Sequence, residues 1–344
     1  MKTDLLTDFR ARRMPALARV ISLVENGRDG YEELLSSLHR DVGHAHRIGI
    51  TGPPGGGKST LVEGLAKTYR ERGLSVAVIA VDPTSPFSGG ALLGDRIRME
   101  SVSTDPGVFI RSMATRGALG GLAVTTEEVA DLLDAFGFER VLIETVGVGQ
   151  TELDIARTAE STVLVLVPES GDGIQTLKAG VMEIADVYVM NKSDRPGADK
   201  LRQEIEVMLG IRRGNAFRHM HAHHGATAGD GAGGRAQPDD AAAWAPPVLA
   251  TVATTGQGVP DLVAALDRHR AWLEASGAFA ARRRARLAER TRAAVDRAVH
   301  HWIWRETGAA ELLARRLDEV MEGARSPYDV AAEILDQVKS GATR

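Results

Sequence analysis

Residues 52–60 read Gly-Pro-Pro-Gly-Gly-Gly-Lys-Ser-Thr, and this segment is the strongest indication of the fold. It matches the phosphate-loop pattern G-x-x-x-x-G-K-[ST], which needs a strand before it and a helix after it. A short run rich in β-branched residues, 47–51, precedes it, and Leu61, Leu65 and Tyr69 follow at helical spacing. The order of strand, glycine loop and helix predicts a nucleotide site, although the motif alone does not specify a reaction.

The residue types of the loop suit a bound triphosphate. Glycines allow successive backbone N–H groups to approach a phosphate, and the positive end of the helix dipole adds to the attraction. Lys58 is expected to reach the outer phosphates, and the Ser59 hydroxyl to ligate Mg²⁺. The predicted phosphate-binding set is Gly55, Gly56, Gly57, Lys58, Ser59 and Thr60.

Composition limits the classes of protein. The chain has 344 residues, 43% of them hydrophobic and 26% charged, which is typical of a globular protein of about two domains. Its net charge of −4 argues against nucleic acid and anionic membranes as partners. Cysteine is absent, which excludes disulfides and thiolate chemistry. With no secretory signal or apolar span in the sequence, we expect a cytoplasmic protein.

Three regions follow from the hydrophobic pattern. The pattern predicts an N-terminal helical extension over residues 1–42, an α/β P-loop domain with a mostly parallel sheet over 43–270, and long amphipathic helices over 271–344. The last region is predicted to be a C-terminal helical dimerisation arm, with packing back onto the same chain as the alternative. The expected strands are residues 47–51, 75–81, 108–110, 140–143, 162–167, 187–190 and 248–250.

Acidic residues follow several of these strands, where ligands bind in parallel sheets. Asp82 and Glu144 are expected to serve the magnesium shell or to orient the attacking water. Asp82 could instead cap a turn with Pro83, and Asp95 is either a switch-loop contact to metal or water or an ordinary loop acid. The N–H of Gly147 is expected to meet the terminal phosphate.

The sequence Asn191-Lys192-Ser193-Asp194 directly follows a predicted strand and matches the guanine-recognition pattern N-K-x-D. A carboxylate accepts hydrogen bonds from both N1–H and the exocyclic amine of guanine, a pair that adenine does not offer. Asn191, Lys192 and Asp194 therefore predict GTP rather than ATP. The N–H of Ala253 is a candidate donor to the guanine oxygen.

With these motifs in order, the sequence resembles the MeaB/ArgK-type GTPases, the chaperones associated with methylmalonyl-CoA mutase. The resemblance covers about residues 40–270. Besides the loop and N-K-x-D, it rests on residues 81–85, 94–99, 111–122 and 144–150, of which 111–122 is the most diagnostic.

The resemblance implies a homodimeric GTPase that converts GTP to GDP and phosphate. It also implies a partner, a cobalamin-dependent acyl-CoA mutase, for which the GTPase gates adenosylcobalamin delivery and protects or reactivates the enzyme. Asp82, Asp95 and Glu144 would belong to its magnesium and hydrolysis machinery. The stretch 169–178 matches the loop that couples nucleotide state to the mutase, with Gln175 and Lys178 as its candidate side chains; the alternative is an inert surface loop.

The clearest departure from the family pattern is a Gly-, Ala- and His-rich insert, residues 213–240. It contains His219, His221, His223 and His224, a spacing that could invite nickel or zinc, but a solvated flexible loop is the preferred interpretation.

The predicted mechanism is hydrolysis of GTP by an in-line water, with slow basal turnover because no arginine finger is evident. Three other functions stay open: a metallochaperone-type GTPase, a P-loop kinase, and a scaffold that binds nucleotide without hydrolysing it.

Overall fold

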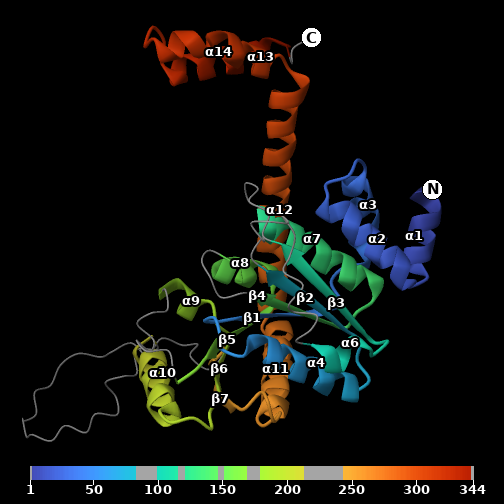
Figure 1. Ribbon diagram of the computed structural model, residues 1–344, viewed down its shortest axis with the longest axis vertical. Helices are drawn as coiled ribbons and strands as arrows, with labels where there is room; N and C mark the ends of the chain where they lie inside the picture. Colours follow the sequence, from blue (N-terminus) through green and yellow to red (C-terminus); the bar gives the residue numbers. More distant parts are fainter. Residues whose placement is uncertain are drawn as a thin grey trace, which may run out of the picture. The chain divides into compact units, whose positions relative to one another are not determined.

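The computed structural model describes residues 2–82, 99–114, 121–145, 151–168, 179–212 and 243–341 (Figure 1). The chain forms two compact units, Met1–Ala280 and Ala281–Arg344. The first contains the sheet and most of the helices, and the second is helical. Within these ranges, no helix combines the length and the apolar character needed to cross a membrane.

The first unit is built on a parallel sheet with the strand order β3-β2-β4-β1-β5-β6-β7 (Figure 1). Strands covered on both faces are apolar throughout, which is the pattern that the sequence displays. The predicted α/β fold with a parallel sheet is confirmed. The strands are β1 (His46–Thr51), β2 (Val76–Asp82), β3 (Val108–Ala114), β4 (Arg140–Thr145), β5 (Ser161–Leu166), β6 (Val187–Asn191) and β7 (Val248–Thr251).

Helices cover both faces of the sheet. Alternate residues of a strand point to opposite faces, so that on β5 Val163 joins one core and Leu164 joins another. One face packs against α4 (Lys58–Glu71), α6 (Glu100–Ser103) and α11 (Val259–Ala275). The opposite face packs against α1 (Lys2–Arg10), α2 (Met14–Glu25), α3 (Tyr31–Leu38), α7 (Gly121–Phe136), α8 (Thr151–Thr158), α9 (Ala179–Glu183) and α10 (Ala198–Arg212).

The N-terminal helices pack on the sheet domain through a shared core. Phe9 of α1 meets the ring of Phe136 edge to face, with centroids 5.2 Å apart. Arg111 of β3 forms an ion pair with Glu25 of α2, and its Nε donates to Glu25 Oε1 at 2.9 Å. A 3₁₀ turn, His39–Asp41, then leads the chain into β1.

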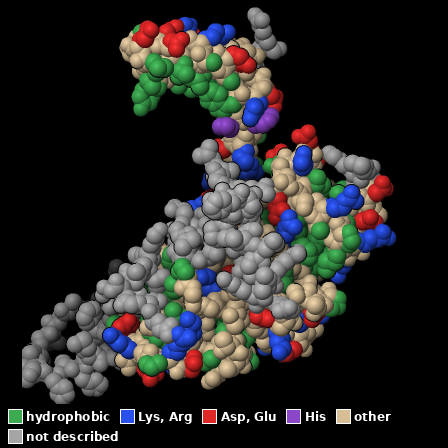
Figure 2. Space-filling view, viewed as in Figure 1, with side chains coloured by type: hydrophobic (Ala, Val, Ile, Leu, Met, Phe, Trp, Pro, Cys, Tyr) green, Lys and Arg blue, Asp and Glu red, His purple; other side chains and the backbone are tan. Residues whose placement is uncertain are grey.

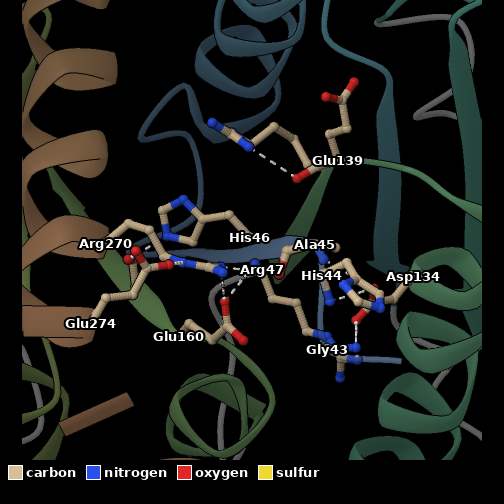
Figure 3. A network of polar contacts seen from close by, with 12 residues as sticks. Gly43, His44, Ala45, His46, Arg47, Asp134, Glu139, Glu160, Arg270 and Glu274 are labelled. Atoms are coloured by element: carbon tan, nitrogen blue, oxygen red, sulfur yellow. Dashed lines mark hydrogen bonds and ion pairs between the residues drawn. The ribbon is translucent and has the colours of Figure 1, made fainter. Parts of the chain in front are cut away.

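A buried ionic network supports the amino-terminal edge of the sheet (Figure 3). Asp134, at the end of α7, accepts from the backbone N–H groups of residues 43, 44 and 45 at 2.8, 3.0 and 2.9 Å. Arg47 Nη2 donates to Asp131 at 2.7 Å and to Asp134 at 3.1 Å. Burial would lower the pKa of Arg47, but the carboxylates of Asp131 and Asp134 outweigh it and raise that pKa above its ordinary value.

Replacing Asp134 should strongly destabilise the first unit. Asp134→Ala leaves three backbone donors without their acceptor and removes one carboxylate from a buried arginine, so we expect a loss of about 3–5 kcal/mol in the free energy of unfolding. Urea unfolding followed by circular dichroism measures it. Asp29→Ala, at an exposed turn, is the control and should change stability by less than about 0.5 kcal/mol. A loss below about 1 kcal/mol for Asp134→Ala would contradict the role given to this network.

A second buried chain of polar groups lies beside this network. His46 Nε2 and His269 Nδ1 each lie 2.7 Å from Ser161 Oγ, and His269 Nε2 lies 3.3 Å from Asp186 Oδ1. Burial, followed by the charge of Arg270, lowers the pKa of His46 well below its ordinary value. His46 is therefore neutral at pH 7, and the chain of contacts ties β1, β5 and α11 together.

The second unit is a helical hairpin at the end of a long helix. Helix α12 (Ala278–His301) ends in a π-helical turn, Trp302–Glu306, and is followed by α13 (Ala309–Met321) and α14 (Pro327–Gly341). Ala309, Leu312, Val330, Ile334 and Val338 form its core. Arg316 donates to Glu319 at 2.7 Å and to Glu333 at 2.9 Å, which links α13 to α14.

Candidate functional site

The phosphate loop and the predicted guanine loop meet at the carboxyl-terminal edge of the sheet. The loop follows β1, which lies between β4 and β5, and the strands β6 and β7 continue the same edge. Ile50 pairs with Glu144 across β1 and β4, and Asn191 pairs with Thr251 across β6 and β7. Parallel pairing therefore brings segments separated by up to two hundred residues to one edge, the usual ligand position in such sheets.

The phosphate loop depends on glycine at two positions of close approach. Gly52 has φ +140°, and a Cβ there would collide with the carbonyl oxygen of Val165 on β5. Gly57 has φ +81°, is the N-cap residue directly before α4, and lies so close to the Asn191 amide that a Cβ would collide with it. The loop is therefore packed directly against β5 and β6, and its backbone N–H groups lie at the start of a helix.

Lys58 is buried, with 6% of its surface exposed, and its ammonium group contacts the backbone of the loop. Nζ donates to the carbonyl oxygen of Gly52 at 2.9 Å and to that of Pro53 at 3.0 Å. These contacts hold a full positive charge against the inside of the loop, where a phosphate of a bound nucleotide would meet it.

Ser59 and Glu144 come together beside the loop. Ser59 Oγ donates to Glu144 Oε1 at 2.7 Å, and the Glu144 side chain is buried. Glu144 lies inside β4, which extends to Thr145, whereas the sequence predicted a strand that ends at residue 143. Thr145 Oγ1 also donates to Thr51 Oγ1 at 3.0 Å, so this end of β4 is held against β1.

The oxygen donors of this pair suit a hard cation. Magnesium prefers oxygen ligands and usually takes one or two from the protein, the rest from water and substrate phosphates. The Ser59 hydroxyl and the Glu144 carboxylate, which are in contact, would supply the one or two ligands that the protein provides. Among the described residues there is no group of three or more His, Asp or Glu side chains that could hold a metal ion by themselves.

Asn191 joins the guanine loop to the phosphate loop. Its Nδ2 donates to the Gly56 carbonyl oxygen at 2.9 Å, and its Oδ1 accepts from Thr251 Oγ1 and from the Ala253 N–H, both at 3.1 Å. Lys192 has φ +56°, a left-handed conformation that turns the chain sharply after β6. Beyond this turn the Asp194 side chain is exposed.

The remaining predicted residues divide into two groups. Asp82 is the last residue of β2, where it pairs with Ala114 of β3. Asp95, Gly147, Gln175, Lys178 and the histidines of residues 213–240 lie outside the described residues.

Sequence reasoning missed the supporting side chains. Thr251 donates to Asn191, and Thr51 accepts from Thr145, yet each threonine has the pattern of an ordinary strand residue. The only signal in the sequence is that each stands at the carboxyl end of a strand beside a predicted motif.

Comparison with known proteins adds independent information. The family described as methylmalonyl-CoA mutase-associated GTPase MeaB matches residues 17–308. A protein of Pyrococcus abyssi named as a GTPase is 44% identical over 343 residues, covering 99% of this chain and 98% of its own. The GTPase ArgK of Escherichia coli is 39% identical over 190 residues, covering 54% of this chain and 57% of its own.

A solved structure supports the fold alone. The crystal structure of a LAO/AO transport system kinase superposes with a TM-score of 0.64 at 24% identity, covering 98% of this chain and 97% of that one.

Proposed function

This chain belongs to the family of methylmalonyl-CoA mutase-associated GTPases MeaB and is a GTPase, and on that premise we propose that it acts as the chaperone of a cobalamin-dependent acyl-CoA mutase. In this role GTP hydrolysis gates adenosylcobalamin delivery and protects or reactivates the mutase. The single observation that carries the site assignment is Asn191, whose amide contacts both Gly56 of the phosphate loop and Ala253.

We assign the phosphates of GTP to the loop of residues 55–60. The backbone N–H groups at the start of α4 and the ammonium of Lys58 would receive them. Lys58 would exchange its contacts to Gly52 and Pro53 for phosphate oxygens. Such an exchange keeps the charge of the lysine compensated in both states.

Ser59 and Glu144 are the residues that would hold Mg²⁺, with Asp82 and Asp95 as the further acids of the site. When bound, the ion would neutralise charge that develops on the phosphates. Glu144 holds the Ser59 hydroxyl in place through the 2.7 Å hydrogen bond. Asp82, Asp95 and Glu144 are our candidates for orienting the attacking water, and Gly147 for a contact to the terminal phosphate.

The base would be selected at the N-K-x-D segment. Asp194 is exposed and available to accept two hydrogen bonds from guanine, while Asn191 and Lys192 position the segment. The Ala253 N–H already donates to Asn191, so it lies at this end of the site and is our candidate donor to the guanine oxygen.

The C-terminal unit is proposed as a dimerisation arm. Leu313, Leu317 and Met321 lie on α13 at helical spacing, and Met321 is 80% exposed. Figure 2 shows hydrophobic side chains gathered along one side of this unit. An apolar stripe of this kind on a soluble helix is typical of an interface, and a second copy of the chain is the partner we propose. The division into residues 1–42, 43–270 and 271–344 remains our functional description of the chain.

The coupling to the mutase is proposed for residues 169–178, with Gln175 and Lys178 as the side chains to test. The support is the family's association with methylmalonyl-CoA mutase. In the order of the sequence, residues 169–178 follow β5 and precede β6, two strands that contribute to the nucleotide edge.

One experiment tests the proposed role. The full chain is incubated with methylmalonyl-CoA mutase and GDP or a non-hydrolysable GTP analogue, and complexes are separated by size exclusion with light scattering. We expect a dimer of the chain, nucleotide-dependent co-elution with the mutase, and phosphate release from GTP that increases when the mutase is present. ATP is the matched control and should not be hydrolysed.

The outcomes separate the parts of the proposal. Failure to co-elute in every nucleotide state would overturn the mutase role while leaving GTP hydrolysis intact. GTP turnover that requires an added acceptor would indicate a kinase. Tight stoichiometric nickel binding in equilibrium dialysis would favour a metallochaperone.

A further inference from the structure

A second pocket lies at the edge of the sheet opposite to the nucleotide site. It has a volume of about 670 Å³. It is bounded by Arg10 at the end of α1, Arg12 in the turn between α1 and α2, Arg40 and Asp41 of the 3₁₀ turn, His44 before β1, and the segment 134–139 before β4. Strands of six residues separate the two edges by about 20 Å. The pocket is therefore distinct from the phosphate loop, and it exists because the N-terminal helices pack on α7.

The floor of the pocket is shaped around one arginine. Gly137 has φ +104°, and a Cβ there would lie 2.5 Å from Nη2 and 2.6 Å from Cζ of Arg12. The Arg12 guanidinium thus rests on the bare backbone of Gly137. On either side of this glycine, the rings of Phe136 and Phe138 stack with centroids 5.8 Å apart.

The backbone of Arg12 is strained. Its φ is +56°, and within the described ranges Lys192 is the other non-glycine residue with a positive φ. A left-handed conformation costs an ordinary residue roughly 1–2 kcal/mol and tends to occur at ligand sites. Lys192 lies in the N-K-x-D segment, so strain of this kind already marks the nucleotide site of this protein.

The acidic side chains of the pocket are mostly occupied elsewhere. Asp134 accepts from three backbone N–H groups and Arg47, and Glu139 Oε2 accepts from the backbone N–H of Ser75 at 2.9 Å. Asp41 lies 3.9 Å from both Arg10 and Arg40, a long contact at an exposed position.

Arg12 is the arginine of the pocket that lacks a carboxylate partner in the described part of the chain. Among the described residues, no carboxylate pairs with Arg12. The lining as a whole holds three arginines and three carboxylates, Asp41, Asp134 and Glu139, and the Arg12 guanidinium is the group available to an anion.

We propose that this pocket binds the phosphate group of a small phosphate ester, with Arg12 as its principal ligand and Arg10 and Arg40 as supporting charges. Guanidinium groups bind phosphate oxygens in a bidentate fashion, and a volume of this size is typical of small-molecule sites. The volume exceeds what inorganic phosphate alone would fill, which is why an ester is assigned. The proposal does not depend on the mutase role.

Calorimetry on the full chain tests it, with GDP at saturation so that the phosphate loop is filled. Ribose 5-phosphate and inorganic phosphate are the two probes. We expect ribose 5-phosphate to bind at one additional site, more tightly than inorganic phosphate, and Arg12→Ala to weaken it at least tenfold. Arg13→Ala is the matched control, because Arg13 is the next residue, is exposed, and pairs with Asp8 at 3.1 Å outside the pocket. Its affinity for the probe should equal that of the unmodified chain.

Three results would overturn the proposal: no binding of ribose 5-phosphate at millimolar concentration, equal binding of both probes, or equal losses in Arg12→Ala and Arg13→Ala. Thermal unfolding of each variant shows whether the fold is retained. As a second variant, Gly137→Ala displaces the Arg12 guanidinium without removing its charge. It should lower the affinity for ribose 5-phosphate, as Arg12→Ala does. Unchanged affinity in Gly137→Ala would also overturn the assignment.

Discussion

Lys58→Ala should lower the rate of GTP hydrolysis by roughly 10²–10³-fold, because it removes a positive charge aimed at the phosphates in a water-poor loop. The Lys58 ammonium is buried and lies 2.9 Å from the Gly52 carbonyl oxygen. Residues 52–60 contain no other cationic side chain that could replace its charge. Phosphate release under saturating GTP measures the turnover, and fluorescence titration with labelled GDP measures the affinity.

The control for this substitution is Lys67→Ala. Lys67 lies on the same helix, α4, but is exposed on its solvent side, so its removal should leave turnover within about twofold of the unmodified chain. Thermal unfolding checks that Lys58→Ala retains the fold. If a folded Lys58→Ala variant hydrolysed GTP at nearly the original rate, the phosphate site assigned to residues 55–60 would be wrong.

Asp194→Asn should change the preferred base from guanine to xanthine. The exposed carboxylate accepts two hydrogen bonds from guanine in the proposed complex. In the variant, the NH₂ group of the amide would face one of the two N–H donors of guanine, and that hydrogen bond would be lost. Hydrogen bonds to charged groups contribute about 1.5–3 kcal/mol each, so the affinity for GDP should fall by roughly 100-fold or more. Xanthosine diphosphate has a carbonyl oxygen in place of the amine, and it should bind the variant more tightly than GDP does.

Competition against labelled GDP measures both affinities. Asp199→Asn is the control, since Asp199 is exposed in the first turn of α10 and is not part of the N-K-x-D segment. It should leave the affinity for both nucleotides unchanged. An Asp194→Asn variant that still preferred GDP would remove the basis for assigning guanine selection to this residue, and Asn191 with Ala253 would then be tested next.

The difference between pattern and structure is clearest at β4. An apolar run predicted a strand over residues 140–143, and the structure continues it through Glu144 and Thr145. Glutamate is unfavourable in a buried strand when judged from the residue alone. It is accommodated here because Ile50 and Ala80 flank it in the sheet and Ser59 donates to its carboxylate. Those partners come from three other segments, which no local pattern reveals.

The C-terminal helices show a similar division. The sequence predicts long amphipathic helices over residues 271–344, and their apolar faces could pack on the same chain or on a second copy. In the structure Val330, Ile334 and Val338 pack into the core of the second unit, whereas Leu317 and Met321 on α13 are exposed. Amphipathic spacing says that a helix needs a partner surface, but it does not say which surface, because equivalent stripes have equivalent periodicity.

From the sequence alone came the parallel sheet, the phosphate loop, the N-K-x-D segment and the family, because each depends on residues that are consecutive or regularly spaced. Local chemistry and periodicity are properties of a single segment, and a sequence displays them directly. Three contacts became visible only in the folded chain: Asn191 with Gly56, Ser59 with Glu144, and Arg12 with Gly137. These contacts join residues 85 to 135 positions apart, and they form only when parallel strands and packed helices bring distant segments together.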